Sequence, residues 1–153
     1  MWPEDLNNII KLLKNLRQDV YGPNHRPFIY FEVIDMGGGS IRNWDYSWMG
    51  RVSEFQYGKF LSEVVQKRNG QKMKYLSTFG QQWGMSSDRD AQIMLDNHDN
   101  QRGHGGILTF FEFREYKIAT AFMLAWPYGL KGHDAVVLKY FKRHIRHQEL
   151  ELC

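Results

Sequence analysis

The chain of 153 residues contains a single cysteine, Cys153, so it cannot form an intrachain disulfide bond. It has no apolar run near the roughly 18 residues that a membrane-spanning helix needs, and we therefore expect no membrane partner. Its first residues lack the basic start and apolar stretch of a secretory signal peptide. The excess of 20 basic over 17 acidic side chains is small, which argues against a nucleic-acid partner.

Aromatic side chains, by contrast, are plentiful. They make up 15% of the residues, and hydrophobic residues as a whole make up 42%, which indicates a folded core rather than a disordered chain. Flat rings also cover the apolar faces of sugars in carbohydrate-binding clefts. We expect most of these rings to lie in the core, because burial is the common fate of large apolar side chains.

Hydrophobic periodicity divides the chain into alternating helices and strands. Apolar residues at helical spacing predict a helix from Pro3 to Val20, and a short β-branched run from Pro27 to Ile34 predicts a buried strand. The other expected elements are strands over 51–55 and 91–95, helices over 60–69 and 110–124, and a short helical or irregular insertion over 75–83. This alternation predicts an α/β fold with a parallel sheet.

Ionisable residues gather where two of the predicted strands end. Glu32 lies late in the first strand, and Asp96 and Asp99 follow the strand over 91–95. In parallel α/β folds, ligands and catalytic groups collect at the carboxyl ends of the strands. Apolar neighbours of Glu32 are expected to desolvate it partly and raise its pKa, which suits a general acid. A carboxylate beside His98 and Arg102 is instead expected to stay ionised.

Each of these features also has a simpler interpretation. Glu32 can be a strand acid that pairs with a neighbouring lysine or arginine. The polar residues 96–104 can form a solvated loop or a capped helix start. A metal site from the acids and histidines of this loop is a further alternative, although their spacing matches neither an EF-hand nor a helical zinc pair.

Four segments resemble the animal-type, chloride-dependent α-amylases, in the same order and at natural spacing. Residues 95–105, LDNHDNQRGHG, resemble the strand-seven signature of that family. Residues 30–38, YFEVIDMGG, resemble the strand-five segment that holds its acid/base glutamate. Residues 51–58, RVSEFQYG, are similar to its sixth strand, and residues 122–129, FMLAWPYG, to the end of its seventh helix. The likeness covers residues 1 to about 129.

The resemblance implies a specific architecture. It implies an α/β fold that is part of a (β/α)₈ TIM barrel, with about strands five to seven and their helices, truncated at both ends. Residues 1–129 would belong to the catalytic barrel. Residues 130–153 would form a divergent basic tail, which we expect to be helical.

The resemblance also assigns roles to single residues. Glu32 corresponds to the catalytic general acid/base, and Asp99 to the third catalytic carboxylate, which grips sugar hydroxyls. The remaining implied positions are the substrate-binding residues His98, His104 and Ile34 and the chloride ligand Asn97.

The implied activity is endo-hydrolysis of α-1,4-glucosidic bonds in starch and glycogen by a retaining mechanism. The implied enzyme is secreted and monomeric, binds α-glucans, and uses calcium and chloride. Its nucleophile and calcium ligands correspond to positions before Met1, so we expect the 153-residue chain alone to be inactive. The chain departs from the family at Trp126, in a shorter glycine-rich loop, and at Gly132, where many members have a second chloride-binding arginine.

Two other functions stay open at the level of sequence. The chain can be a non-catalytic protein that binds α-glucan through the retained cleft residues. It can also be a basic interaction module whose tail helix binds an acidic partner.

Overall fold

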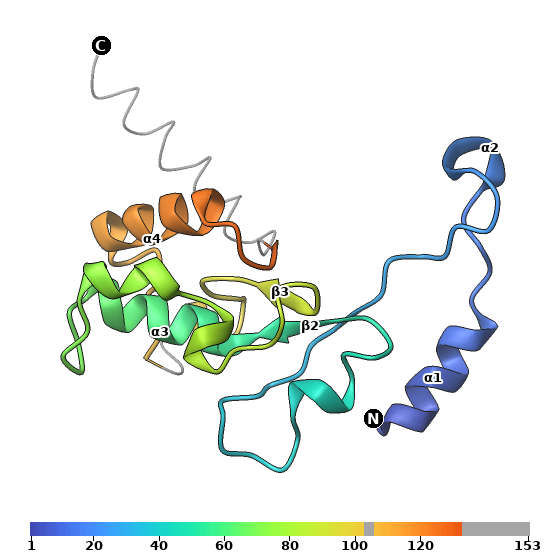
Figure 1. The fold of residues 1–153 in the computed structure, drawn as a ribbon, viewed down its shortest axis with the longest axis horizontal. Coiled ribbons are helices and arrows are strands. Elements are labelled where there is room, and N and C mark those ends of the chain that lie inside the picture. Colours follow the sequence, from blue (N-terminus) through green and yellow to red (C-terminus); the bar gives the residue numbers. More distant parts are fainter. Residues whose placement is uncertain (103–105, 133–153) are drawn as a thin grey trace.

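The computed structural model describes residues 1–102 and 106–132, and its central element is a parallel sheet with the strand order β1-β2-β3-β4 (Figure 1). The strands are β1 (Tyr30–Phe31), β2 (Arg51–Glu54), β3 (Ala91–Ile93) and β4 (Leu130–Lys131). All three neighbouring pairs are parallel. The predicted α/β fold with a parallel sheet is thus confirmed.

The fourth strand comes from the segment that we assigned to the divergent tail. Leu130 pairs with Gln92 and Lys131 pairs with Ile93, so the sheet continues past residue 129. The turn into β4 depends on Gly129, which has a φ of +64°. A Cβ atom there would lie 2.5 Å from a side-chain carbon of Ile93, so this position combines a left-handed backbone with close packing. The expected helix of the tail lies outside the described residues.

Two helices pack against the sheet and form the core with it. They are α3 (Phe55–Val65) and α4 (Phe113–Ala125). The buried cluster joins Leu61 of α3, Met123 of α4 and Ile93 of β3, each with no exposed surface. Helix α3 approaches β3 closely because Gly58 has no side chain, and a Cβ atom there would lie 2.2 Å from the Leu95 carbonyl oxygen.

The predicted helix over residues 3–20 is wrong in its extent. The structure contains α1 (Pro3–Leu12) and a separate short α2 (Gln18–Tyr21). The Arg26 guanidinium donates hydrogen bonds to the carbonyl oxygens of Ile10 and Leu13, at 2.6 and 2.5 Å. These bonds satisfy carbonyl groups that a continued helix would otherwise use, and they stabilise the break.

The remaining predictions differ from the structure mainly at element boundaries. The strand expected from Pro27 to Ile34 is shortened to β1, at one edge of the sheet. Helix α3 begins earlier than expected because the Glu54 side chain caps it by accepting from the Gln56 N–H. The short helical or irregular insertion consists of two 3₁₀ helices, η2 (Met73–Thr78) and η3 (Gln81–Trp83). Across the described part of the chain, no helix is long and apolar enough to cross a membrane.

Candidate functional site

Glu32 lies immediately after β1, at the carboxyl end of the strand, whereas the sequence predicted it late within a longer strand. Its side chain is exposed, and that of Ile34 is 66% exposed, whereas Val33 and Asp35 are buried. The alternation arises because successive side chains of an extended segment point to opposite faces. The expected partial desolvation of Glu32 by its apolar neighbours is therefore not found in this chain.

Ser53 of β2 holds the main chain next to Glu32. The Val33 N–H donates to Ser53 Oγ at 2.7 Å, and Ser53 Oγ in turn donates to the Val33 carbonyl oxygen at 3.0 Å. Ser53 has no exposed surface, so both bonds are shielded from water. A side chain thus extends the pairing of the two strands by one step beyond their main-chain partners.

Asn97 connects the end of β3 to Glu32. Its Nδ2 donates to Glu32 Oε1 at 3.3 Å, across 65 positions of sequence. Its Oδ1 accepts from the N–H groups of Asp99 and Asn100, at 3.1 and 2.9 Å. These two bonds fix the orientation of the amide, so its NH₂ group faces the Glu32 carboxylate.

A cavity of about 300 Å³ lies beside this contact. Glu32, Asn97 and His98 all line it, together with Gln92 and Gly132. The structure therefore brings together three of the six residues that the resemblance singled out.

The other three residues are placed differently. Asp99 is exposed, and its Oδ1 lies 3.4 Å from Nε2 of the adjacent His98. Ile34 projects into solvent from the segment after Glu32. His104 lies outside the described residues.

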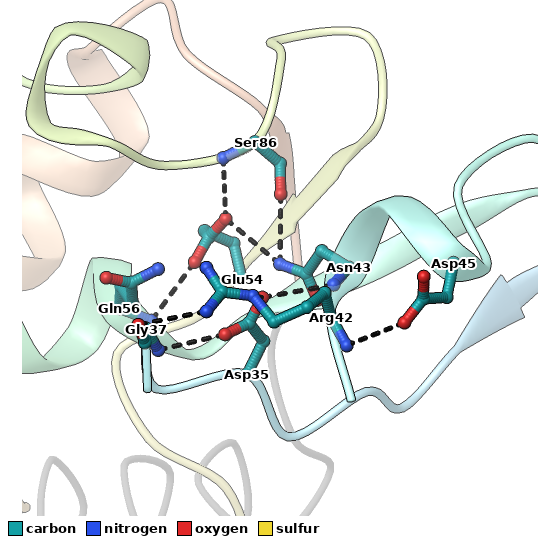
Figure 2. Close-up of polar contacts among 8 residues, drawn as sticks. All are labelled: Asp35, Gly37, Arg42, Asn43, Asp45, Glu54, Gln56 and Ser86. Atoms are coloured by element: carbon teal, nitrogen blue, oxygen red, sulfur yellow. Dashed lines mark hydrogen bonds and ion pairs between the residues drawn. The ribbon is translucent and has the colours of Figure 1, made fainter. Parts of the chain in front are cut away.

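A buried polar network fixes the loop that follows Glu32 (Figure 2). Asn43 connects its two carboxylates: the Asn43 N–H donates to Asp35 Oδ2 at 3.0 Å, and Asn43 Nδ2 donates to Glu54 Oε2 at 3.2 Å. The Ser86 N–H donates to the same Glu54 oxygen at 2.8 Å. Asp35, Asn43 and Glu54 are 3%, 4% and 0% exposed, so the carboxylates depend on these donors rather than on water.

Arg42 supplies the positive charge of this network. Its Nε lies 3.1 Å from Asp35 Oδ2, and its Nη1 donates to the Gly37 carbonyl oxygen at 2.9 Å. The Gly37 N–H donates to Asp35 Oδ1 at 2.8 Å. The loop between Asp35 and β2 is therefore held by contacts within itself, and Asn43 joins it to Glu54 of β2, just beyond the candidate acid.

The described residues do not complete the ion sites that the resemblance implies. Asn97 directs its NH₂ group to a carboxylate, and Gly132 offers no side chain for a chloride ion. A Cβ atom added at Gly132 would lie 2.3 Å from Gln92 Nε2, so Gln92 occupies the space that a side chain at this position would need. Within the described residues, no group of three or more histidine, cysteine or acidic side chains could hold a metal ion.

Sequence reasoning missed the residues that support the candidate acid. Ser53 and Glu54 are polar residues within a short buried strand, and that contrast was the available signal. Asn43 gave no comparable signal, because its role depends on a loop conformation that brings residues 35, 54 and 86 together.

The sequence is similar to animal α-amylases. It is 52% identical over 134 residues to alpha-amylase 1B from Homo sapiens and 49% identical over 133 residues to an alpha-amylase from Oryzias latipes. Both alignments cover 84% of this chain and 26% of the relative, so the chain spans about a quarter of the length of these proteins. No family model matches the chain.

The fold is similar to a solved animal enzyme as well. Alpha-amylase I from Eisenia fetida matches with a TM-score of 0.83 and 48% sequence identity. The match covers 86% of this chain and 27% of that one. A variant of the same enzyme, solved as a complex with maltohexaose, matches equally well. The resemblance to animal α-amylases that the motifs predicted is therefore confirmed.

Proposed function

We propose that this chain is a portion of an animal-type α-amylase that carries its acid/base residue and its third catalytic carboxylate. The parent enzyme would hydrolyse internal α-1,4-glucosidic bonds of starch and glycogen with retention of configuration. One observation carries the proposal. In a chain 52% identical to a human α-amylase, Glu32, Asn97 and His98 gather around one cavity at the carboxyl ends of the strands.

Glu32 is suited to the acid/base role by its position. In a retaining glycosidase, such a group protonates the leaving oxygen and later accepts a proton from the attacking water. An exposed carboxyl group beside a cavity can reach a bound glycosidic oxygen, and the Asn97 amide gives it a defined partner at 3.3 Å. The nucleophile that completes this chemistry would be supplied by a segment that precedes residue 1 in the family.

The remaining roles follow the resemblance. Asp99 would accept hydrogen bonds from sugar hydroxyls, His98 and His104 would contact the substrate near the cleavage point, and Ile34 would line the leaving-group side. An α-glucan substrate is supported by the maltohexaose bound to the Eisenia fetida variant. The four-stranded sheet would form one arc of a (β/α)₈ barrel, completed by segments outside this chain.

The parent enzyme would be secreted and monomeric, as the resemblance implies. Its calcium site would take its ligands from outside the described residues. A chloride site would need at least one cationic ligand besides Asn97, because an anion beside the Glu32 carboxylate requires positive charge to hold it.

The first experiment compares the chain with a complete enzyme. Residues 1–129 replace the matching segment of alpha-amylase I from Eisenia fetida, and this chimera is assayed on soluble starch beside the 153-residue chain. We expect the chimera to release reducing sugar and the chain alone to release no more than its Glu32→Gln variant. Loss of one member of a catalytic unit costs several orders of magnitude in rate. A folded but inactive chimera would contradict the proposal.

The same chimera tests the individual roles. Glu32→Gln should lower kcat/KM on a maltooligosaccharide by about a hundredfold or more, since general acid–base catalysis is worth roughly 10²–10⁴-fold. Asp99→Asn should reduce both binding and turnover. Asp96→Asn is the control, because Asp96 is 4% exposed and accepts a hydrogen bond from the Tyr116 hydroxyl at 2.9 Å. The assignment fails if a folded Asp96→Asn chimera is as inactive as the Asp99→Asn chimera.

The experiment also separates the alternative function. A non-catalytic α-glucan-binding protein would bind maltohexaose as the isolated chain, and its segment would give an inactive chimera. That pair of results would replace the hydrolase proposal with the binding one.

A further inference from the structure

The main chain that carries Glu32 lies at the point where strand pairing ends. The last paired residues of β1 and β2 are Phe31 and Val52, and Glu32 follows one residue later. Its side chain is exposed, so packing against other side chains does not define its direction. The position of its carboxyl group therefore depends on the Asn97 amide that donates to it and on how firmly the backbone on either side is held.

The hydroxyl of Ser53 provides that support on the carboxyl-terminal side. It accepts the N–H of Val33, which belongs to the peptide unit joining Glu32 to Val33, and so fixes the plane attached to Glu32 Cα. It also donates to the Val33 carbonyl oxygen, and thereby holds the next peptide unit. One side-chain oxygen thus replaces both bonds of a strand ladder.

Burial makes this anchor rigid. Ser53 is 0% exposed and Val33 is 4% exposed, so water cannot compete for either hydrogen bond. The next residue of β2, Glu54, binds Asn43 and Ser86, and Asn43 in turn holds Asp35 (Figure 2). Two adjacent residues of β2 therefore hold the chain directly after Glu32 and the loop beyond it.

We infer that Ser53 is a positioning residue for Glu32, acting through the Val33 peptide units to aim the acid/base carboxyl group at the leaving oxygen. The inference rests on the proposed function. A misplacement of about 1 Å at a catalytic group can cost roughly a hundredfold in rate, so loss of this anchor should affect turnover far more than substrate affinity.

A matched control exists in the same protein. Ser62 of α3 is also buried, at 1% exposure, and also makes two hydrogen bonds to the main chain: its Oγ donates to the Gly58 carbonyl oxygen at 2.5 Å and accepts from the Leu108 N–H at 2.8 Å. It does not contact the Glu32 segment. Ser62→Ala therefore removes the same chemistry from a position that only supports the fold.

The test uses the chimera with Ser53→Ala, Ser53→Thr and Ser62→Ala, assayed on two substrates. Maltoheptaose has a poor leaving group that must be protonated, whereas the fluoride of α-maltosyl fluoride leaves with little help from an acid. We expect Ser53→Ala to lower kcat on maltoheptaose about tenfold or more, with KM within about twofold, and to lower kcat/KM on the fluoride, which reports only the step that expels fluoride, less than about threefold. Ser53→Thr retains the hydroxyl and should restore both values.

Several outcomes would overturn the inference. Ser53→Ala could lower the activity on both substrates by the same factor. It could also lose no more activity on either substrate than Ser62→Ala does. Either result would assign Ser53 to the fold alone. If Ser53→Ala does not fold, Ser53→Cys replaces it, and full maltoheptaose activity in that variant would refute the role because a thiol is a weak hydrogen-bond partner. An inactive but folded parent chimera would instead refute the proposed function, so the two failures are distinguishable.

Discussion

The two parts of the described chain, residues 1–50 and residues 51–132, differ sharply in how they bury their apolar side chains. Helix α3 buries seven of its residues, and β3 and α4 complete the core around it. Helix α1 buries none, and it lies apart from the sheet in Figure 1 together with α2. Yet α1 and α3 both have apolar residues at the spacing that places them on one face of a helix.

The difference teaches that an apolar stripe indicates a surface meant for packing, even where the described residues do not provide the packing partner. Ile9 and Leu12 are 48% and 83% exposed on α1. The chain spans about a quarter of the length of its relatives, at 26%, and the relatives therefore contain further sequence of the kind that would cover such a stripe. The contrast between the two regions can be tested with the same substitution made in each.

The largest effect is expected for a leucine pair. Leu61 has no exposed surface, and Leu61→Ala should lower the free energy of unfolding by about 2–5 kcal/mol because it leaves a cavity in the core. Leu12→Ala, at 83% exposure, should change it by less than about 0.5 kcal/mol. Urea denaturation of the 153-residue chain measures both. A comparable loss in the two variants would show that α1 is packed in solution.

A glycine pair should give the next largest difference. Alanine favours a helix over glycine by about 1 kcal/mol, but a Cβ atom at Gly58 would lie 2.2 Å from the Leu95 carbonyl oxygen. The clash should dominate, so Gly58→Ala is expected to destabilise the chain by about 1–3 kcal/mol. Gly38→Ala has no atom within 4 Å of the new Cβ and should be nearly neutral. Thermal denaturation of both variants shows whether each substitution raises or lowers the stability. A stabilised Gly58→Ala variant would contradict the close contact between α3 and the segment after β3.

A tyrosine pair compares buried and exposed hydroxyl groups. The Tyr116 hydroxyl donates to Asp96 Oδ1 at 2.9 Å in a buried site, so Tyr116→Phe should cost about 1.5–3 kcal/mol. The Tyr46 hydroxyl donates to the Met1 carbonyl oxygen at 3.2 Å in an exposed site, and Tyr46→Phe should cost less than about 0.5 kcal/mol. Equal unfolding midpoints in urea for the two variants would remove the distinction.

The smallest effect concerns pH. Partial burial raises the pKa of Glu112, but hydrogen bonds from Thr109 and the charge of Arg68 outweigh it and leave the pKa below the ordinary value of 4.5. A depressed pKa stabilises the folded state above the unfolded-state value, and this stabilisation is lost as the pH falls through the folded-state pKa. Thr109→Val should therefore be slightly less stable than the parent at neutral pH, and the difference should shrink below about pH 4.

Residues 1–50 contain a comparable carboxyl group with a lowered pKa, that of Asp19. The hydrogen bond from Arg17 lowers the pKa of Asp19, but both side chains are largely exposed and water screens the pair. Arg17→Ala should leave the pH dependence of unfolding unchanged. Acid titrations of both variants, followed by circular dichroism, provide the comparison, and a larger effect at Arg17 would reverse it.

The parts of the fold that local pattern decides were predictable from sequence. Glycine and proline positions and hydrophobic spacing located α4 and β3 to within three residues and α3 to within five, and the apolar runs placed Glu32 and Asp96 near strand ends. The break between α1 and α2 was not predictable, because it depends on the Arg26 side chain reaching back 16 residues to Ile10. The exposure of Glu32 was missed because apolar neighbours in sequence point to the opposite face of an extended chain.

The network around Asn43 also has a consequence for the order of folding. Its hydrogen bonds connect Asn43 to Glu54 and Ser86, which lie 11 and 43 positions away, so three distant segments must meet before Glu54 has its partners. A carboxylate desolvated without donors is costly, and a partly assembled state would therefore keep Glu54 in water. Closure of the loop after Glu32 and docking of the segment before β3 should then occur together, as one late event on the folding pathway.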